Sequence, residues 1–432
     1  MGNVVKTLNG KLSGFETENA YIFRGVPYAK PPTNNLRFAA PQKCDPWDGV
    51  LDATKFPKRA MQKEFTGFYK KEFFYGEYHD SGMSEDCLYL NIWAPKDMSA
   101  GSKYPVAVWI HGGRFLGGYG FEREFDGEEY TKRGVILVTI NYRLGMFGFF
   151  AHPELTKRDG HSGNYGLLDQ IAAIDWVREN IAAFGGNRSD ITVFGQSAGG
   201  YSVRCLASSP LAKGKFQKAI IQSCGGYHGT IMKEITMEQV EKVCAAYLKK
   251  HKLNLEALMQ LPEERVLELS ARFLLFGIIH GGRLFSLVPC IDNWLLTGDI
   301  DGLVDNNETM TIPYMAGCTK NDILVSRKGV KDRQDNRLYN GSVGWCVEHS
   351  KRGTPSYSYY FSREVPGGDG KAFHTSELWY MFGTLDRCWR PMTDRDRALS
   401  KEMVDCWTDF MKTGDPGWHP CTKDNPYAKE FN

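Results

Sequence analysis

The chain has 432 residues, of which 42% are hydrophobic and 24% charged, the proportions of an ordinary soluble globular protein. Its 53 Lys and Arg residues nearly balance 51 Asp and Glu residues, so the net charge of +2 excludes an electrostatic case for binding nucleic acid or an anionic membrane. No run of 18 apolar residues predicts a membrane span, and the polar start, Met1 to Lys6, does not resemble a secretory signal. We therefore expect a cytoplasmic protein, secreted only if a leader was removed.

The eleven cysteines are scattered from Cys44 to Cys421 and include no Cys-x-x-Cys pair. This spacing argues against a zinc site and against a disulfide framework. We predict that most are buried as small hydrophobic residues. We predict no metal and no cofactor, and a monomer or homodimer.

Short apolar runs alternating with helical patterns predict a mostly parallel sheet with helices on both faces. The predicted strands, in chain order, are 106–110, 135–140, 191–194, 219–221 and 312–316. The clearest helix runs from Tyr165 to Phe184, with apolar residues near helical spacing and Gly185-Gly186 as its stop.

A second helical pattern covers 236–277 and opens with a Thr236-x-x-Gln239 capping box. No repeat, low-complexity segment or Pro/Ser-rich linker divides the chain. We predict one α/β domain over residues 1–432, with 234–277 as a helical insertion that acts as a lid.

The sequence Gly195-Gln196-Ser197-Ala198-Gly199 joins the predicted strand 191–194 to a predicted helix. A turn this tight needs small residues, because its backbone is strained and its walls are close. Such a turn lifts the Ser197 hydroxyl out of the sheet and directs the Ala198 N–H at the reacting group. The five-residue pattern also occurs by chance, so a hydrolytic site needs further support.

That support begins at the end of the predicted strand 106–110, where the chain reads His111-Gly112-Gly113-Arg114-Phe115. A serine hydroxyl is a poor nucleophile and needs a base, an acid that holds the base, and donors for the oxyanion. In open α/β sheets the donor loop precedes the serine, and the acid and the histidine follow it. We expect the backbone amides of Gly113, Arg114 and Ala198 to converge on one oxygen as an oxyanion hole.

Further motifs extend this pattern over most of residues 20–230. They are Phe23-Arg24-Gly25-Val26-Pro27-Tyr28-Ala29, Leu36-Arg37-Phe38, Ser84-Glu85-Asp86-Cys87-Leu88, Asn141-Tyr142-Arg143-Leu144-Gly145 and Gly163-Asn164-Tyr165-Gly166. With these motifs the chain resembles the type-B carboxylesterase (cholinesterase-like) family of α/β hydrolases, and within it the bacterial-type carboxylesterases. The resemblance implies an α/β-hydrolase fold, with a mostly parallel central sheet covered by helices on both faces.

The resemblance also implies the two remaining catalytic residues. The family's acid follows a late strand, and Asp322 stands here where Glu is usual. His374 lies in a segment that resembles the family's histidine loop before an aromatic helix. The other two histidines after Asp322 are His349 and His419, which we expect at the surface.

The chain departs from the family pattern at several positions. Arg114 replaces a usual glycine or alanine, and its side chain either points outward to a carboxylate or borders the pocket and favours anionic or phenolic substrates. Cys87 stands at a usual disulfide position, but Ala60 replaces the expected partner, so we predict a free thiol. The aromatic segment 65–75 is expected either to form a pocket wall or simply to pack in the core.

The pocket itself is predicted from residues near the elbow and the following strand. The candidates that line it are Phe115, Gln196, Gly225, Gly226 and Tyr227. Gln196 replaces a glutamate common in relatives, which weakens the case for cationic choline esters. Only 52 positions separate Asp322 from His374, so part of the lid is deleted or residues near 326–340 are missing from the sequence.

These observations predict a serine carboxylesterase that works through an acyl-enzyme, with a small-molecule ester as its partner. The expected substrates are aryl or medium-sized acyl esters, such as phenolic, hydroxycinnamoyl or xenobiotic esters. One alternative is an acyltransferase or an amide or C–C hydrolase with the same triad. A second alternative is a non-catalytic binding module, which the retained serine and histidine disfavour.

Overall fold

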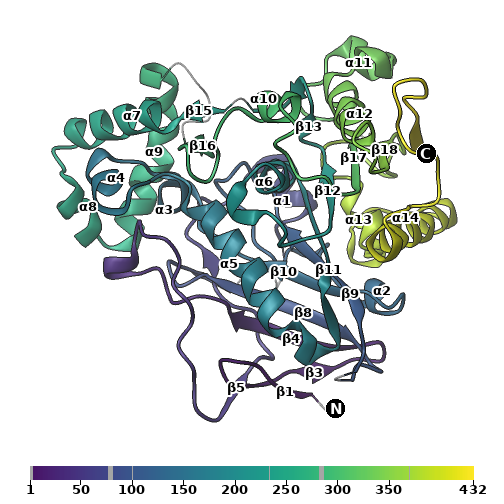
Figure 1. Ribbon diagram of the computed structural model, residues 1–432, viewed down its shortest axis with the longest axis horizontal. Coiled ribbons are helices and arrows are strands. Elements are labelled where there is room, and N and C mark those ends of the chain that lie inside the picture. The colour runs from purple at the N-terminus through teal and green to yellow at the C-terminus, as the bar shows by residue number, and fades with distance from the viewer. Residues whose placement is uncertain (1–2, 76–80, 100, 233, 282–286, 369) are drawn as a thin grey trace.

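The computed structural model describes residues 3–75, 81–99, 101–232, 234–281, 287–368 and 370–432. A ten-stranded sheet runs through the molecule (Figure 1). From one edge to the other its strands are β19 (Ala428–Phe431), β18 (Ser356–Phe361), β17 (Tyr314–Thr319), β12 (Lys218–Gln222), β11 (Gly186–Gln196), β9 (Tyr104–Ile110), β10 (Ile136–Ile140), β8 (Tyr89–Pro95), β4 (Ala20–Pro27) and β3 (Phe15–Glu16).

The strands from β10 to β19 pair in parallel, as the alternating pattern predicted. β8, β4 and β3 continue the sheet in antiparallel pairing. All five predicted strands are confirmed, in β9, β10, β11, β12 and β17. Because their carboxyl ends meet at one edge, the loops after β9, β11 and β17 can build a common site.

Both faces of the sheet are buried. Along β9, Val106, Val108 and Ile110 belong to one apolar cluster, whereas Ala107 and Trp109 belong to the other. Alternate side chains of a strand point to opposite faces, so a strand covered on both sides reads as a continuous apolar run. This is why a periodicity of two is absent from these segments.

Different helices cover the two faces. On one face lie α5 (Tyr165–Asn180), which is the predicted helix, and α6 (Ala198–Ala207). On the other lie α2 (Glu128–Thr131), α13 (Leu378–Met381) and α14 (Asp394–Thr413). A short 3-10 turn, Ile181–Phe184, continues α5, and Gly185 ends it in the left-handed conformation.

The predicted helical segment is three helices, α7 (Met237–Lys250), α8 (Leu255–Gln260) and α9 (Glu263–Gly281). The Thr236 capping box is confirmed, since Thr236 and Gln239 bond each other's backbone N–H groups. Figure 1 shows these helices grouped on the opposite side of the molecule from α12 (Arg337–Ser350) and α14. The prediction that they form a lid remains untested.

The remaining elements surround this core. They are β1 (Val4–Lys6), β2 (Lys11–Ser13), β5 (Val50–Asp52), β6 (Arg59–Ala60), α1 (Gly67–Glu72), β7 (Met83–Ser84), α3 (Gly145–Phe149), α4 (Pro153–Asp159), β13 (Gly225–Gly226), β14 (Gly229–Thr230), β15 (Ile235–Thr236), β16 (Cys290–Ile291), α10 (Ile300–Asp305) and α11 (Arg327–Lys331).

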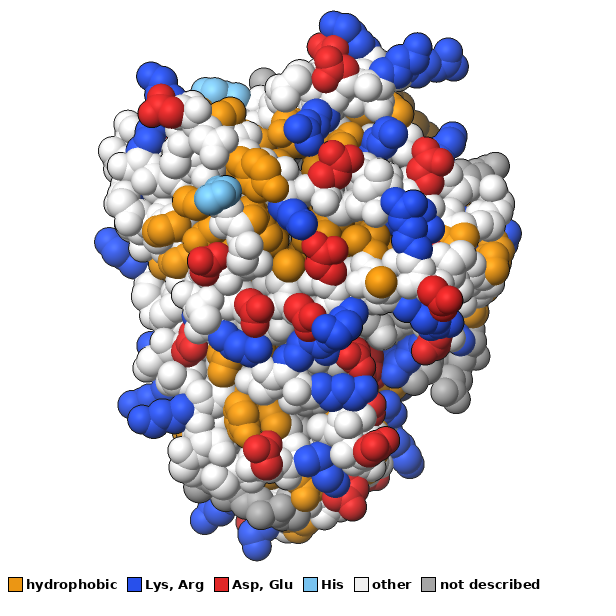
Figure 2. Space-filling view, turned by 90° about the vertical axis from the view of Figure 1, so that its right-hand side faces the viewer, with side chains coloured by type: hydrophobic (Ala, Val, Ile, Leu, Met, Phe, Trp, Pro, Cys, Tyr) orange, Lys and Arg blue, Asp and Glu red, His pale blue; other side chains and the backbone are white. Residues whose placement is uncertain are grey.

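Acidic and basic side chains are interspersed over the face shown in Figure 2, in keeping with the small net charge. Among the described helices, none has the length and apolar character needed to cross a membrane. All eleven cysteines lie in the described ranges and are free thiols, eight of them buried, which confirms the prediction for Cys87.

Candidate active site

Ser197 lies at the junction of β11 and α6, in the strand–turn–helix geometry that its flanking glycines predict. Its φ of 57° and ψ of −122° belong to a region that L-residues rarely occupy. A Cβ on Gly199 would overlap the carbonyl oxygen of Ile110, and one on Gly200 would lie 2.7 Å from that of Gln222. Only glycine at these positions lets α6 approach the sheet this closely, and this approach presents Ser197 at the sheet's carboxyl edge.

The loop after β9 lies beside the serine. An ideal Cβ on Gly112 would be 3.2 Å from the Cβ of Ser197. Gly113 and Arg114 both have positive φ, 100° and 62°, and the Gly113 carbonyl accepts from two following N–H groups. Within the described part of the chain, the N–H groups of Gly113 and Ala198 have no protein acceptor. These unused donors are available to a ligand oxygen.

Asp322 and His374 meet although they lie on different loops. Nδ1–H of His374 donates to Oδ1 of Asp322 at 2.5 Å. A β-bridge between Asn321 and Phe373, with the Asn321 N–H bonded to the Ala372 carbonyl at 2.8 Å, joins the loops next to this contact. The two side chains are therefore aligned by backbone pairing.

The contact with Asp322 changes the proton affinity of His374. Burial lowers the pKa of His374, but the charge and hydrogen bond of Asp322 outweigh burial and raise it above its usual value. Nearby, burial and the charge of Asp322 raise the pKa of Glu377 to about 7. Glu377 is fully buried, and its Oε1 accepts from the Ser223 hydroxyl at 3.2 Å.

Gln196, next to the serine, faces the imidazole ring. Its Nε2 lies 3.3 Å from Nε2 of His374. Because Nδ1 carries the proton given to Asp322, the neutral ring has its lone pair on Nε2, which can accept from the Gln196 amide. The same amide nitrogen lies 3.4 Å from Nδ1 of His374, so the Gln196 side chain packs against the imidazole ring next to the elbow.

Ser197 and His374 line one cavity of about 400 Å³. The aromatic segment 65–75 forms part of its wall, which settles the alternative left open for that segment in favour of a pocket wall. The lining residues are Phe65, Tyr69, Phe73, Phe74, Gly112, Gly113, Arg114, Glu122, Glu124, Phe125, Gln196, Ser197, Ile231, Met232, Ile323, Leu324, His374, Thr375 and Leu378. None of these belongs to the helical segment 234–277.

Of the five predicted pocket residues, the structure places only Gln196 among these lining residues. Phe115, which has a positive φ of 60°, is fully buried against Phe149 and Tyr201. The other three candidates pack on helices outside the cavity. Gly225 and Gly226 face α12, and the hydroxyl of Tyr227 donates to Asp305 of α10.

Arg114 has an exposed side chain and lines the cavity, in line with the interpretation that it borders the pocket. His419 is exposed, as predicted. The prediction for His349 is wrong, since only 1% of it is exposed. It lies between the rings of Tyr314 and Trp345, and this burial lowers its pKa to about 3.

Three buried acids near the site were not predicted to have a role: Glu122, Glu124 and Glu377. Glu122 and Glu124 flank Arg123 in the segment that follows the glycine-rich loop. Two acidic residues so close to the predicted oxyanion loop are a signal in the sequence for a role at the site. Nothing local distinguished Glu377 from a surface residue.

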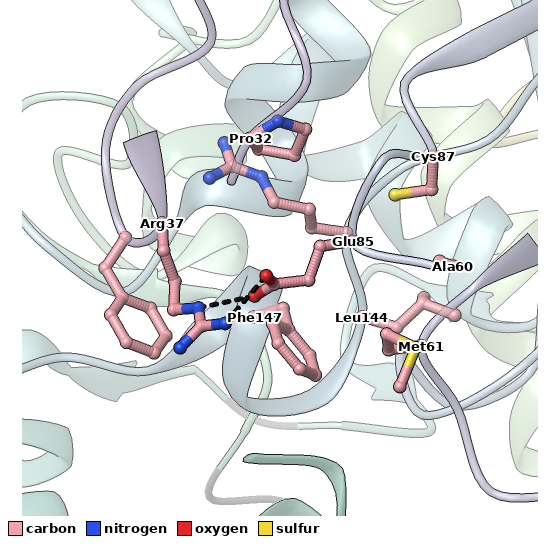
Figure 3. A pocket seen from close by; sticks show the side chains of 10 residues that line it. Pro32, Arg37, Ala60, Met61, Glu85, Cys87, Leu144 and Phe147 are labelled. Atoms are coloured by element: carbon pink, nitrogen blue, oxygen red, sulfur yellow. Dashed lines mark hydrogen bonds and ion pairs between the residues drawn. The ribbon is translucent and has the colours of Figure 1, made fainter. Parts of the chain in front are cut away.

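A second cavity, of about 10 Å³, lies among N-terminal loops and holds the buried ion pair between Arg37 and Glu85 at 2.5 Å (Figure 3). It has room for about one water molecule, so we regard it as structural. Among the described residues, no group of three or more His, Cys, Asp or Glu side chains could hold a metal ion.

The sequence matches the Carboxylesterase family over residues 1–340 and again over 326–430. The two matches overlap at 326–340, where the approach to His374 is unusually short. Para-nitrobenzyl esterase of Bacillus subtilis (strain 168) is 34% identical over 468 residues, covering 96% of this chain and 90% of that protein. Carboxylesterase 1E of Mus musculus is 38% identical over 336 residues, covering 74% of this chain and 58% of that protein.

The fold is also similar to that of solved esterases. A PNB esterase structure superposes with a TM-score of 0.87 and 31% identity, covering all of this chain and 96% of the other. Sequence and architecture thus agree over nearly the whole length. The chain belongs to the carboxylesterase family and has its α/β-hydrolase fold.

Proposed function

We propose that the protein hydrolyses carboxylic esters with Ser197 as nucleophile, His374 as general base and Asp322 as the acid that orients the base. The observation that carries the proposal is the 2.5 Å contact of His374 with Asp322 beside a cavity that also contains Ser197. Family membership supports ester hydrolysis as the reaction class.

In the proposed reaction, Oγ of Ser197 attacks the ester carbonyl carbon and gives its proton to Nε2 of His374. The N–H groups of Gly113, Arg114 and Ala198 donate to the oxygen that becomes negative. Loss of one such donor typically costs on the order of 10²–10³ in rate. The carbon–oxygen bond to the alcohol then breaks, and the alcohol leaves with the proton from His374.

Water completes the cycle. His374 takes a proton from water, the resulting hydroxide adds to the acyl carbon, and Ser197 leaves as the free hydroxyl with that proton. Asp322 stays ionised throughout and stabilises the imidazolium form of His374. No cofactor takes part in these steps.

The wall of the cavity supports aryl or medium-sized acyl esters as the substrate class. Aromatic residues from segment 65–75 and aliphatic residues such as Ile231 and Leu378 line the cavity. A cavity of about 400 Å³ lies within the usual range for small-molecule sites, which are lined mainly by apolar groups.

The test is a panel of p-nitrophenyl and hydroxycinnamoyl esters with acyl chains from two to ten carbons. Wild type should release p-nitrophenol, whereas Ser197→Ala should retain its melting temperature and lose at least about 10³-fold in kcat. A wild-type protein that cleaves no ester, or a Ser197→Ala variant at the wild-type rate, would refute the proposal.

A further inference from the structure

Two glutamates lie in the wall of the cavity that contains Ser197, and the proposed reaction uses neither. Glu122 is 6% exposed and Glu124 is 1% exposed. Acidic side chains are almost never buried to this extent unless they are paired. Their burial beside a substrate cavity therefore calls for a partner.

The protein satisfies this pair only in part. The Tyr119 N–H donates to Oε1 of Glu122 at 2.9 Å, and the two carboxyl groups lie close enough for each to change the pKa of the other. Among the described residues, Oε2 of Glu124 has no hydrogen-bond partner. An acceptor oxygen is thus left buried at the cavity wall.

Among the described residues, the charge of Arg59 lowers the pKa of Glu122, but burial outweighs it. The Arg59 guanidinium also binds Glu64 at 2.9 Å and lies over the ring of Tyr119. His111 is nearby, and burial lowers its pKa to about 4, so it is uncharged at neutral pH.

The pair retains protons in the absence of a cation. Burial raises the pKa of Glu122 to about 8, and burial together with the charge of Glu122 raises the pKa of Glu124 well above its usual value. A positively charged group placed against the carboxyl groups would replace a proton, because it stabilises the ionised form in a site shielded from water.

The rest of the wall suits an organic cation. Phe125 lies next to Glu124 in the chain, and the stacked rings of Phe65 and Phe74, 4.3 Å apart, line the same cavity. Aromatic faces attract ammonium groups and also pack against the apolar carbon that carries them.

We propose that Glu122 and Glu124 form a recognition site for a protonated amino group, so that the preferred substrates are esters carrying a primary, secondary or tertiary ammonium on an apolar chain. The inference rests on the proposed function, because Ser197 occupies the same cavity. The unsatisfied Oε2 of Glu124 can accept from the N–H of a protonated amine, which a quaternary ammonium lacks. Glu124 is therefore the specificity-determining residue.

The test compares two ligands of equal shape, hexylammonium and 1-hexanol, by calorimetry at pH 7.5 and as competitive inhibitors of p-nitrophenyl butyrate hydrolysis. Wild type should bind hexylammonium roughly tenfold more tightly or better. Glu124→Gln should abolish the preference for the amine, and Glu122→Gln should weaken it. Glu154→Gln, which changes an exposed charge outside the cavity, is the matched control and should preserve both the preference and the activity.

A third ligand needs no variant. Hexyltrimethylammonium carries the same charge without an N–H donor, so wild type should bind it more weakly than hexylammonium. Equal affinity for hexylammonium and 1-hexanol, or a preference that persists in folded Glu124→Gln, would overturn the inference. Calorimetry measures binding without turnover, so failure of ester hydrolysis and failure of ammonium binding are separate results.

Discussion

Oδ1 of Asp322 accepts a 2.5 Å hydrogen bond from His374, a residue 52 positions further along the chain. Asp322 is fixed independently of His374, because the Thr319 N–H donates to Oδ2 at 3.1 Å and the Ile323 N–H donates to Oδ1 at 2.8 Å. Backbone N–H groups therefore hold the acid in place in addition to the imidazole. This arrangement favours one tautomer of His374, with the lone pair on Nε2.

Replacing Asp322 tests that relationship. Asp322→Asn keeps the shape but loses the charge and favours the wrong tautomer, so kcat/KM for a p-nitrophenyl ester should fall by about 10³–10⁴-fold. Asp322→Glu keeps the charge and should retain more activity than Asn does. An Asn variant at the wild-type rate would show that the contact has no role in catalysis.

The pH dependence should follow the charges around His374. Only the neutral imidazole can act as base, so kcat/KM should fall as the pH falls through a pKa that Asp322 raises above 6.5. Gln196→Glu places a negative charge beside the ring and should move this acid limb to higher pH. Glu377 also raises the pKa of His374, but with its own pKa at about 7 it is only partly ionised in this range, so Glu377→Gln should move the limb slightly to lower pH. Shifts in the opposite directions in pH–rate profiles would contradict the assignment of His374.

The glycines of the elbow can be tested through stability. Gly199→Ala places a methyl group on the Ile110 carbonyl oxygen and should destabilise the fold by about 1–3 kcal/mol or more, with loss of activity. Gly101→Ala is the matched control, because its Cβ would meet nothing within 4 Å. Urea unfolding of both variants makes the comparison. Equal stability would show that α6 can move away from the sheet.

A buried ion pair connects the aromatic wall to the histidine loop. Glu72, at the end of α1, binds Arg390 through two hydrogen bonds of 2.9 Å, and Arg390 lies over the ring of Phe373, next to His374. Glu72→Gln leaves a buried guanidinium uncompensated and should cost about 3–5 kcal/mol in stability. It should also raise KM for aryl esters, because the wall is no longer anchored.

The control for that variant is Lys401→Ala, which removes an exposed pair with Asp405. Such pairs contribute about 0–1 kcal/mol, so its melting temperature and KM should match wild type. If Glu72→Gln behaves like Lys401→Ala, the buried pair does not position the wall.

The structure of a segment can be predicted from the sequence where its local residue pattern reflects its environment in the folded chain. β9, β11 and β12 are buried on both faces and read as apolar runs, and the elbow is specified by glycines that nothing else can replace. His349 lies among polar neighbours in the sequence, but the rings of Tyr314 and Trp345 bury it. Its environment comes from contacts that a local pattern does not contain.

The cavity wall shows the same limit. Gly225 and Gly226 follow β12, which predicts a position near the elbow, but the chain turns there toward α12. The sequence-based prediction assigns no role to Glu122 and Glu124, and only the folded chain shows them buried at the cavity wall. Which residues line the cavity depends on which loops come together in the folded chain, and a local sequence pattern does not predict those contacts.

The most direct test of the central claim is peptide mass spectrometry after reaction with diisopropyl fluorophosphate. The reagent loses fluoride and leaves a diisopropylphosphoryl group on an activated serine oxygen. We predict one such group per chain, on Ser197, with labelling abolished by Ser197→Ala and strongly slowed by His374→Ala. Labelling of a different residue, or no labelling of an enzyme that cleaves esters, would contradict the assignment of Ser197 as the nucleophile.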